Sequence, residues 1–246
     1  MSESKIEIKT HDGVAPAYVF RPQGEGHWPA VLFYMDAIAI RPALFAMAER
    51  LASHGYYVLL PDLFYRSGSY ARFDAATAFQ DEAEQSRLKS LTQATNNDKA
   101  ARDTDAFLKF LSTQSAVRGD KVGCVGYCMG GRFALVAAGT SPERVAAAAC
   151  FHGARLATDA PDSPHLLAPN MRGELYIGVA GIDQHFSEQE KLRLQDALDA
   201  AHVRYSLEVY PNARHGFAVN DTLVYDRDAA ERHWEKTLEL FGRTLA

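Results

Sequence analysis

The feature that most constrains the fold is an apolar stretch that ends among closely spaced glycines, residues 121–131 (Lys-Val-Gly-Cys-Val-Gly-Tyr-Cys-Met-Gly-Gly). This order predicts a short strand, a Gly-x-Cys-x-Gly turn and a helix, which is the layout of a nucleophile elbow with cysteine at its corner. A sharp reversal from strand to helix leaves no room for a Cβ at Gly126 or Gly130. The corner then presents Cys128 above the sheet, where the amides of the helix N-terminus favour negative charge.

A structural interpretation of the cysteines stays open, because a free cysteine most often packs as a small buried residue. Cys124 and Cys150 lie inside apolar, strand-like runs and fit that interpretation. Cys128 differs, since it stands where the strand pattern stops and the glycines begin. We therefore expect Cys128 to be the reactive thiol.

Bulk properties exclude several classes of function. The 246 residues carry a net charge of −5 with no basic block, so we expect no nucleic-acid partner. No apolar run approaches the roughly 20 residues of a membrane span, and the first residues lack the apolar region of a signal peptide. Three cysteines are too few for a disulfide framework, which favours a cytoplasmic protein. We expect a monomer or a homodimer. The absence of paired metal-ligand spacing, of Gly-x-Gly-x-x-Gly and of a P-loop predicts no metal and no cofactor.

Periodicity along the chain predicts a parallel α/β architecture. Alternating residues at 5–10 and 15–20 flank a turn signal at Asp12-Gly13 and predict an antiparallel hairpin. Continuous apolar runs at 29–35 and 56–60 predict strands buried on both faces, joined by a helix that starts at Pro42. Further strands are expected at 145–151, 174–180 and 205–210, and further helices at 99–111, 132–139, after the capping box of Ser187 and Glu190, and around 230–241. We predict one α/β domain over residues 1–246, with a mostly parallel sheet flanked by helices on both faces.

Residues 64–97 interrupt this rhythm, because they are alternately polar and aromatic and contain no strand pattern. One interpretation is a partly helical excursion over the carboxyl edge of the sheet, of the kind that covers active sites. The alternative is a solvated insertion without a role.

Three chemically suitable residues follow successive strands, in the order nucleophile, acid, histidine: Cys128, Asp183 and His215. In parallel sheets such positions gather at one edge. His215 would accept the thiol proton, and Asp183 would orient the imidazole. Each residue also has a structural interpretation as an ordinary turn or loop residue, and His185, close to Asp183, competes for the role of base.

The chain resembles the dienelactone hydrolase (carboxymethylenebutenolidase) family of α/β-hydrolases. The resemblance lies in Gly-Tyr-Cys-Met-Gly-Gly, in the Gly-x-Asp turn at Asp183, in His-Gly-Phe at 215–217 and in the strand from Pro29 that ends in an acid. It spans roughly residues 6–241. It implies an α/β-hydrolase fold and hydrolysis of a small ester or lactone through an acyl-cysteine.

The resemblance also assigns supporting residues. Family members carry a Glu that contacts the resting thiol; the matching residue is Asp36, which is one methylene shorter. The oxyanion hole is expected at the backbone amides of Ala37 and Met129.

The family's substrate-binding arginine, four residues after the histidine, is replaced by Val219. A more apolar ester or another small lactone is therefore as plausible as the dienelactone. Arginines of the excursion are candidate replacements, and the loop 152–155 is expected to line the pocket. The expected substrate-pocket residues are Tyr65, Arg66, Arg87, His152 and Phe217.

Two other functions remain possible from the sequence. A cysteine amidase of flavodoxin-like build also uses a Gly-x-Cys-x-Gly elbow, but it places His and Glu together near the C-terminus, and here the acid precedes the histidine. A non-catalytic or redox-sensing thiol module needs only an exposed, oxidisable Cys128 and gives no role to Asp183 or His215.

Overall fold

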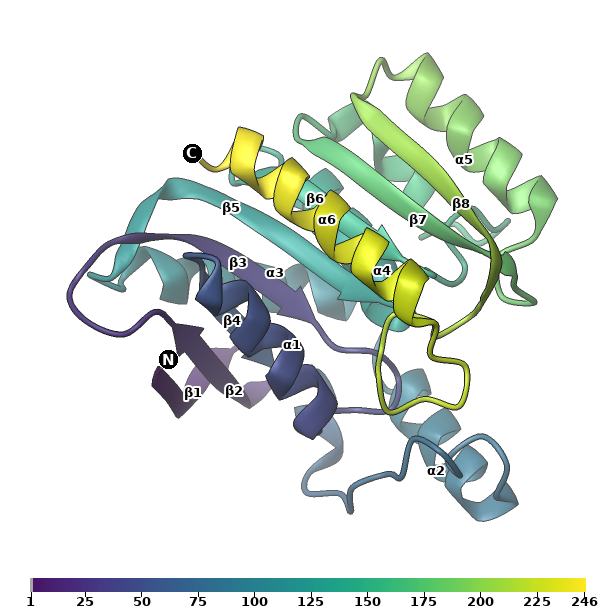
Figure 1. Ribbon diagram of the computed structural model, residues 1–246, viewed down its shortest axis with the longest axis horizontal. Coiled ribbons are helices and arrows are strands. Elements are labelled where there is room, and N and C mark those ends of the chain that lie inside the picture. The colour runs from purple at the N-terminus through teal and green to yellow at the C-terminus, as the bar shows by residue number, and fades with distance from the viewer. Residues whose placement is uncertain (1) are drawn as a thin grey trace.

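An eight-stranded sheet organises the structure, a computed structural model that describes residues 2–246 (Figure 1). The strand order is β1-β2-β4-β3-β5-β6-β7-β8. The strands are β1 (Ser2–Thr10), β2 (Gly13–Arg21), β3 (Trp28–Tyr34), β4 (Tyr57–Pro61), β5 (Val117–Tyr127), β6 (Val145–Phe151), β7 (Glu174–Ile182) and β8 (Tyr205–Arg214). The helices are α1 (Pro42–Ser53), η1 (Tyr65–Ser67), α2 (Glu82–Gln93), α3 (Asn97–Ser112), α4 (Met129–Thr140), η2 (Pro164–Asn170), α5 (Glu188–Ala200) and α6 (Arg227–Thr244).

The predicted N-terminal hairpin is confirmed. Strands β1 and β2 pair antiparallel with Thr10 opposite Gly13, where the backbone has φ +144° and favours glycine. Strand β2 then pairs antiparallel with β4. The six strands β4, β3, β5, β6, β7 and β8, in sheet order, run parallel to one another. The sheet is therefore mostly parallel, as the apolar strands predict.

Helices cover both faces of the sheet, with α1 and α6 on one side and α3 and α4 on the other (Figure 1). Helix α1 begins at Pro42 and buries Leu44, Met47 and Leu51 against the sheet. Helix α4 is apolar nearly all round, which matches its position between the sheet and α3. Six of the seven residues of β6 are buried, and Ala146 is partly exposed. The centre of the sheet therefore has no solvent-facing side.

The structure differs from the predicted elements in two places. Strand β8 continues past Pro211 to Arg214, because it is an edge strand where a missing N–H is tolerated and a register shift against β7 accommodates the proline. The segment after β6, predicted as a loop, contains the 3₁₀ helix η2. Within the described residues 2–246, no helix is long and apolar enough to cross a membrane.

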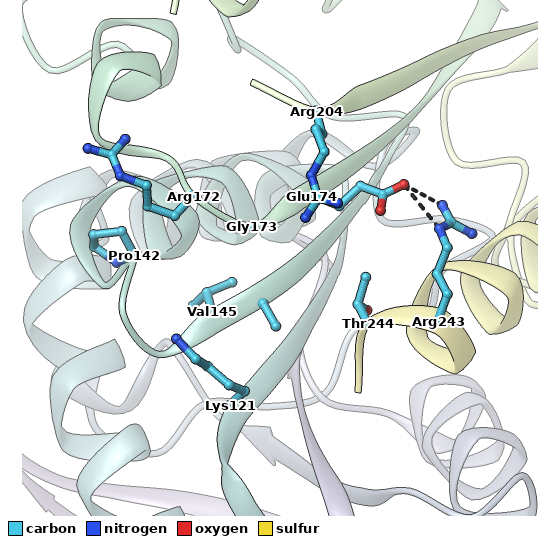
Figure 2. Close-up of a pocket in the computed structure, with 10 residues that line it drawn as sticks. Lys121, Pro142, Val145, Arg172, Gly173, Glu174, Arg204, Arg243 and Thr244 are labelled. Atoms are coloured by element: carbon cyan, nitrogen blue, oxygen red, sulfur yellow. Dashed lines mark hydrogen bonds and ion pairs between the residues drawn. The ribbon is translucent and has the colours of Figure 1, made fainter. Parts of the chain in front are cut away.

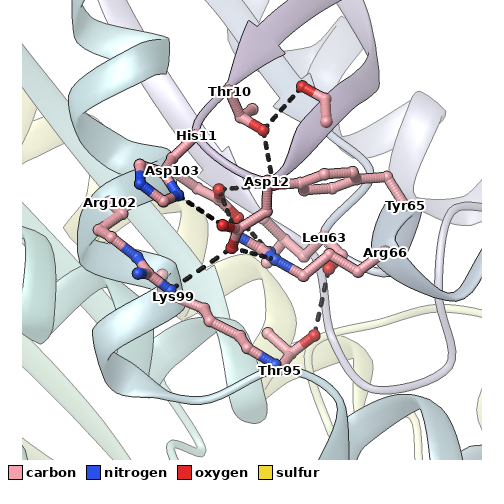
Figure 3. Close-up of polar contacts among 12 residues, drawn as sticks. Thr10, His11, Asp12, Leu63, Tyr65, Arg66, Thr95, Lys99, Arg102 and Asp103 are labelled. Carbon is pink, nitrogen blue, oxygen red and sulfur yellow. Dashed lines mark hydrogen bonds and ion pairs between the residues drawn. The ribbon is translucent and has the colours of Figure 1, made fainter.

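Residues 64–97 contain no strand, as predicted, and include η1 and α2. The start of this excursion is fixed by a polar network (Figure 3). Arg66 binds the buried carboxylate of Asp103 through two nitrogens, at 2.7 and 2.8 Å, and also reaches Asp12 in the hairpin turn. The hydroxyl of Tyr65 donates to Asp103 at 2.8 Å. This network ties the excursion to α3 and to the β1–β2 turn.

Candidate active site

The elbow between β5 and α4 holds its cysteine in a strained conformation. Cys128 has φ 54° and ψ −114°, a region that non-glycine residues rarely adopt. The flanking glycines are sterically required: a Cβ at Gly126 would overlap the carbonyl of Gly130, and a Cβ at Gly130 would overlap the carbonyl of Tyr34. The sequence-based reason for these glycines is therefore confirmed in atomic terms.

A carboxylate and an imidazole converge on this corner from the ends of β7 and β8. Asp183, whose side chain is 2% exposed, accepts a hydrogen bond from Nδ1 of His215 at 2.8 Å. Its other oxygen accepts the backbone N–H of His185 at 2.7 Å. The ring of His185 packs beside His215, with ring centroids 4.7 Å apart, but makes no bond to the acid. Of the two competing histidines, His215 is the one whose ring the acid orients.

The second nitrogen of His215 faces the thiol. Nε2 is buried and has no hydrogen-bond partner of good geometry within residues 2–246. Burial lowers the pKa of His215, but the negative form of Cys128, followed by Asp183, outweighs burial and raises that pKa from 6.5 to about 10. Cys128 and Asp183 together therefore favour the protonated form of His215.

Two cavities meet at the sulfur. A wide cavity of about 860 Å³ extends along α2, the start of α3 and α4, and a narrow cavity of about 360 Å³ lies toward the loop after His215. Ala37, Phe79, Cys128 and His215 line both. Because α2 contributes to the wide cavity and residues 75–80 to the narrow one, the excursion forms part of the wall of the site.

The position of Ala37 and Met129 suits an oxyanion hole. Met129 is the first residue of α4, where helix geometry leaves the backbone N–H without an intrahelical partner. Ala37 follows β3 and lines both cavities beside the sulfur. Two amides on either side of Cys128 can donate to an oxygen that becomes negative when the thiolate attacks a carbonyl.

Asp36 takes part in a buried ion network instead of bonding to the thiol. Its two oxygens bind the guanidinium of Arg41 at 2.7 and 2.8 Å, and one also accepts the N–H of Ile38. Arg41 is 3% exposed and binds Asp221 on its other side, at 2.7 and 3.1 Å. No hydrogen bond joins Asp36 to Cys128 in the described chain, because the bidentate arginine occupies the carboxylate. This network connects the loop after β3 to the loop that follows His215.

The expected substrate-pocket residues separate into two groups. His152 lines the narrow cavity, and Phe217 packs against its ring from behind at 5.3 Å between centroids. Tyr65 and Arg66 belong instead to the network with Asp103 (Figure 3), and Arg87 pairs with Glu84 on α2. Neither cavity at Cys128 is lined by these last three residues, and each of them bonds to a carboxylate that also lies outside both cavities. Val219 is fully buried.

His152 is an unusual member of the site. It is 1% exposed, has φ 38°, and neither ring nitrogen has a hydrogen-bond partner within residues 2–246. Burial lowers the pKa of His152 well below 6.5, and the nearby charge of His215 acts in the same direction. The ring therefore lies neutral beside the catalytic imidazole candidate, 5.1 Å between centroids.

Sequence reasoning missed Arg41, Asp221, Asn97 and Arg132. Arg41 follows four apolar residues, and an arginine among apolar residues is a signal for a buried ion pair. Arg132 lies in the first turn of α4, four residues after Cys128, and it lines the same wide cavity. Asp221 and Asn97 carry no local pattern that marks them.

The opposite edge of the sheet has a different character (Figure 2). A shallow hollow of about 370 Å³ lies at the amino ends of β5 to β8. Four exposed cations surround it, Lys121, Arg172, Arg204 and Arg243, and Arg243 pairs with Glu174 at 2.6 Å. Among residues 2–246, no cysteine, serine or histidine lines this hollow.

A mostly parallel sheet covered on both faces, with a nucleophile elbow after β5, an acid after β7 and a histidine after β8, defines an α/β-hydrolase. The model of the dienelactone hydrolase family matches residues 15–245, and the chain belongs to that family.

A sequence relative and two solved structures are similar to this chain. A protein of Synechocystis sp. named "Putative carboxymethylenebutenolidase" is 25% identical over 234 residues, which is 93% of this chain and 91% of the relative. A structure titled "Putative Dienelactone Hydrolase" from Klebsiella pneumoniae has a TM-score of 0.85 at 20% identity and covers 98% of each chain. The dienelactone hydrolase of Anabaena variabilis has a TM-score of 0.70 at 23% identity, covering 100% of this chain and 99% of that one.

Proposed function

We propose that the protein hydrolyses small carboxylic esters or lactones through an acyl-cysteine intermediate. Cys128 is the nucleophile, His215 the general base and acid, and Asp183 the residue that orients the imidazole. One observation carries the proposal: the Asp183–His215 bond of 2.8 Å orients an imidazole whose Nε2 is buried at the two cavities that Cys128 also lines.

The reaction follows from this geometry. The Cys128 thiolate attacks the ester carbonyl carbon, and the amides of Ala37 and Met129 stabilise the resulting oxyanion. The C–O bond to the leaving group breaks, and the His215 imidazolium gives its proton to the departing oxygen. Neutral His215 then removes a proton from water, whose oxygen attacks the thioester. The thiolate leaves, and the acid product is released.

Intact-protein mass spectrometry with a panel of p-nitrophenyl esters and lactones tests the proposal. We expect an acyl adduct on Cys128, and loss of both adduct and turnover in Cys128→Ala. Cys124→Ala is the matched control, because burial raises the pKa of the Cys124 thiol and keeps it protonated and unreactive. Turnover that is unchanged in Cys128→Ala contradicts the proposal.

Asp183→Asn separates hydrolysis from a thiol that merely senses oxidants. The asparagine keeps the side-chain shape but loses the charge that fixes the imidazole tautomer, so kcat should fall by about 10²–10⁴-fold. A redox module predicts instead that oxidation of Cys128 is unaffected in this variant. Glutamine hydrolysis without esterase activity would favour the amidase.

A further inference from the structure

One wall of the wide cavity is the polar face of helix α2. Residues 82, 85, 86, 89, 92 and 93 line this cavity, and because they recur every three or four positions they form a single helix face. Leu91, on the opposite side of the helix, is buried. A polar helix face ordinarily lies against bulk water. Here it lies against a cavity that Cys128 also lines.

Neutral hydrogen-bonding groups are the commonest feature of this cavity. Among residues 2–246, nine side chains with a hydroxyl or an amide group line the wide cavity, and two line the narrow one. Helix α2 contributes Gln85, Ser86, Thr92 and Gln93. Pockets for small molecules are usually walled by apolar side chains with a few polar groups. The wide cavity departs from that pattern, which favours a ligand that is polar along much of its surface.

Charges of both signs are present on the same wall. Glu82 and Asp162 are acidic, and Lys89, Arg132 and Arg155 are basic. A ligand with one net charge would meet groups that repel it as well as groups that attract it. The nearly balanced wall therefore favours a neutral polar ligand.

Two buried atoms of the wall lack a hydrogen-bond partner in the described chain, and one is an acceptor while the other is a donor. Asn97, 8% exposed, donates through Nδ2 to the carbonyl of Asp162 at 2.7 Å, which leaves its Oδ1 as the unpartnered acceptor. The unpartnered donor is Nε of Arg132 on α4, the helix that packs against α3. A carboxylate would satisfy only Arg132, and an ammonium group only Asn97. Hydroxyl groups donate as well as accept, so they can satisfy both.

The narrow cavity suits the other part of an ester. Its volume is about 360 Å³, against about 860 Å³ for the wide cavity. Its wall includes the aliphatic residues Ile38, Ala75, Leu223 and Val224, and the exposed Arg214 also lines it. A short acyl chain matches the aliphatic part of this smaller space, which leaves the wide cavity to the alcohol part.

We propose that the wide cavity binds the alcohol part of the substrate and that this part carries several neutral hydroxyl groups, as in a short-chain ester of a sugar or another polyol. This inference rests on the proposed function and deepens it. When the C–O bond breaks, the imidazolium of His215 gives its proton to the polyol oxygen, and a neutral polyol leaves. The polar face of α2, Asn97 and Arg132 then act in substrate selection.

The experiment compares butyrate esters that have the same carbon skeleton with and without hydroxyl groups. 1-Butyrylglycerol is matched with propyl butyrate, and 6-O-butyrylglucose is matched with cyclohexylmethyl butyrate. Each kcat/KM is divided by the rate constant of hydroxide-catalysed hydrolysis, which removes differences in intrinsic reactivity. We expect the hydroxylated ester of at least one pair to be preferred by about 10-fold or more. The pair with the larger ratio distinguishes an open-chain polyol from a sugar ring.

Variants then assign the preference to the wall. In Asn97→Leu the ratio of hydroxylated to plain ester should fall about 5- to 10-fold, mainly through KM for the hydroxylated ester. Ser86→Ala, at an exposed position of α2, should lower the ratio about 2- to 5-fold and serves if Asn97→Leu does not fold. Ser90→Ala is the matched control. It makes the same substitution at an exposed position of the same helix that lines neither cavity, so the ratio should not change.

Contrary outcomes separate this inference from the proposed function. A ratio of one or less for both pairs overturns the inference, and so does turnover of p-nitrophenyl butyrate without turnover of any of the four esters. A ratio that Asn97→Leu and Ser86→Ala leave unchanged, or that Ser90→Ala lowers equally, also overturns it, because the hydroxyl groups would then not bind this wall. Absence of Cys128-dependent turnover of every ester, p-nitrophenyl butyrate included, refutes the proposed function itself.

Discussion

The two edges of the sheet carry similar side chains in opposite states. At the amino edge, arginines and a lysine are exposed around a shallow hollow, and the carboxylate among them is paired (Figure 2). At the carboxyl edge, charged and polar groups are buried, and several have no partner. Among residues 2–246, five residues have buried side-chain atoms without a hydrogen bond, and four of them line the cavities at Cys128: Asn97, Arg132, His152 and His215.

The comparison separates groups that contribute to folding from groups kept ready for a ligand. A buried polar atom without a partner costs about 1–3 kcal/mol, so evolution retains it where a substrate or a reaction step uses it. Exposed ion pairs contribute little and cost little. The exposed charges around the hollow therefore say less about function than the unpaired and strained groups at the elbow.

The strongest test of this contrast removes one arginine from each edge. Arg41→Met leaves Asp36 buried without its counterion, and unfolding free energy should fall by about 3–5 kcal/mol. Arg243→Met breaks the exposed pair with Glu174 and should cost less than about 1 kcal/mol. Urea denaturation of both variants measures the difference. Equal losses would mean that burial does not govern these pairs.

Two glycine-to-alanine substitutions, one at the buried elbow and one at an exposed helix face, extend the comparison to the backbone. Gly130→Ala forces a Cβ into the carbonyl of Tyr34, where rigid strand and helix backbones meet, and should destabilise the protein by about 1–3 kcal/mol. At Gly242, on the exposed face of α6, a Cβ meets nothing within 4 Å, and alanine should stabilise the helix by about 0.5–1 kcal/mol. Thermal melting followed by circular dichroism checks both. A stabilising effect of alanine at position 130 would remove the steric account of the elbow.

The smallest expected effect concerns the proton on His215. Its folded-state pKa is about 10, above the ordinary 6.5, so protonation stabilises the fold fully below pH 6.5, and this contribution is lost as pH rises through about 10. Cys128→Ala removes the largest cause that raises this pKa, so the titration midpoint should move to lower pH. NMR titration of the imidazole resonances measures it. A midpoint that does not move in Cys128→Ala would show that sulfur and ring do not interact.

Much of the fold could be predicted from the sequence because the sheet is parallel and buried, and its strands are continuous apolar runs. The hairpin, the elbow glycines and the helix at Pro42 each have local causes, and each was confirmed. The extension of β8 past Pro211 has no local cause, since it depends on β8 being an edge strand and on its register against β7.

The residues of the site also divide into those that the sequence predicts and those that only the tertiary structure places. Cys128, Asp183 and His215 follow β5, β7 and β8, three parallel strands of one sheet, so the topology brings them to the same edge. The partners of Tyr65 and Arg66 come from the hairpin turn and α3, and one of the two carboxylates that bind Arg41, Asp221, lies 180 residues away, so only tertiary structure determines them. The assignment of an arginine to substrate or to structure depends on whether a carboxylate reaches it, and no pattern in the chain encodes that distance.

The network that holds Tyr65 and Arg66 has a consequence for protein engineering. It anchors the start of residues 64–97 outside both cavities, and Asn96, which caps α3, closes the other end. The segment between these anchors can therefore be exchanged as a unit. Exchanging residues 71–93 for segments of other length or polarity would redraw the entrance to the reactive sulfur, while every residue proposed to handle the proton or the oxyanion stays on the unaltered scaffold.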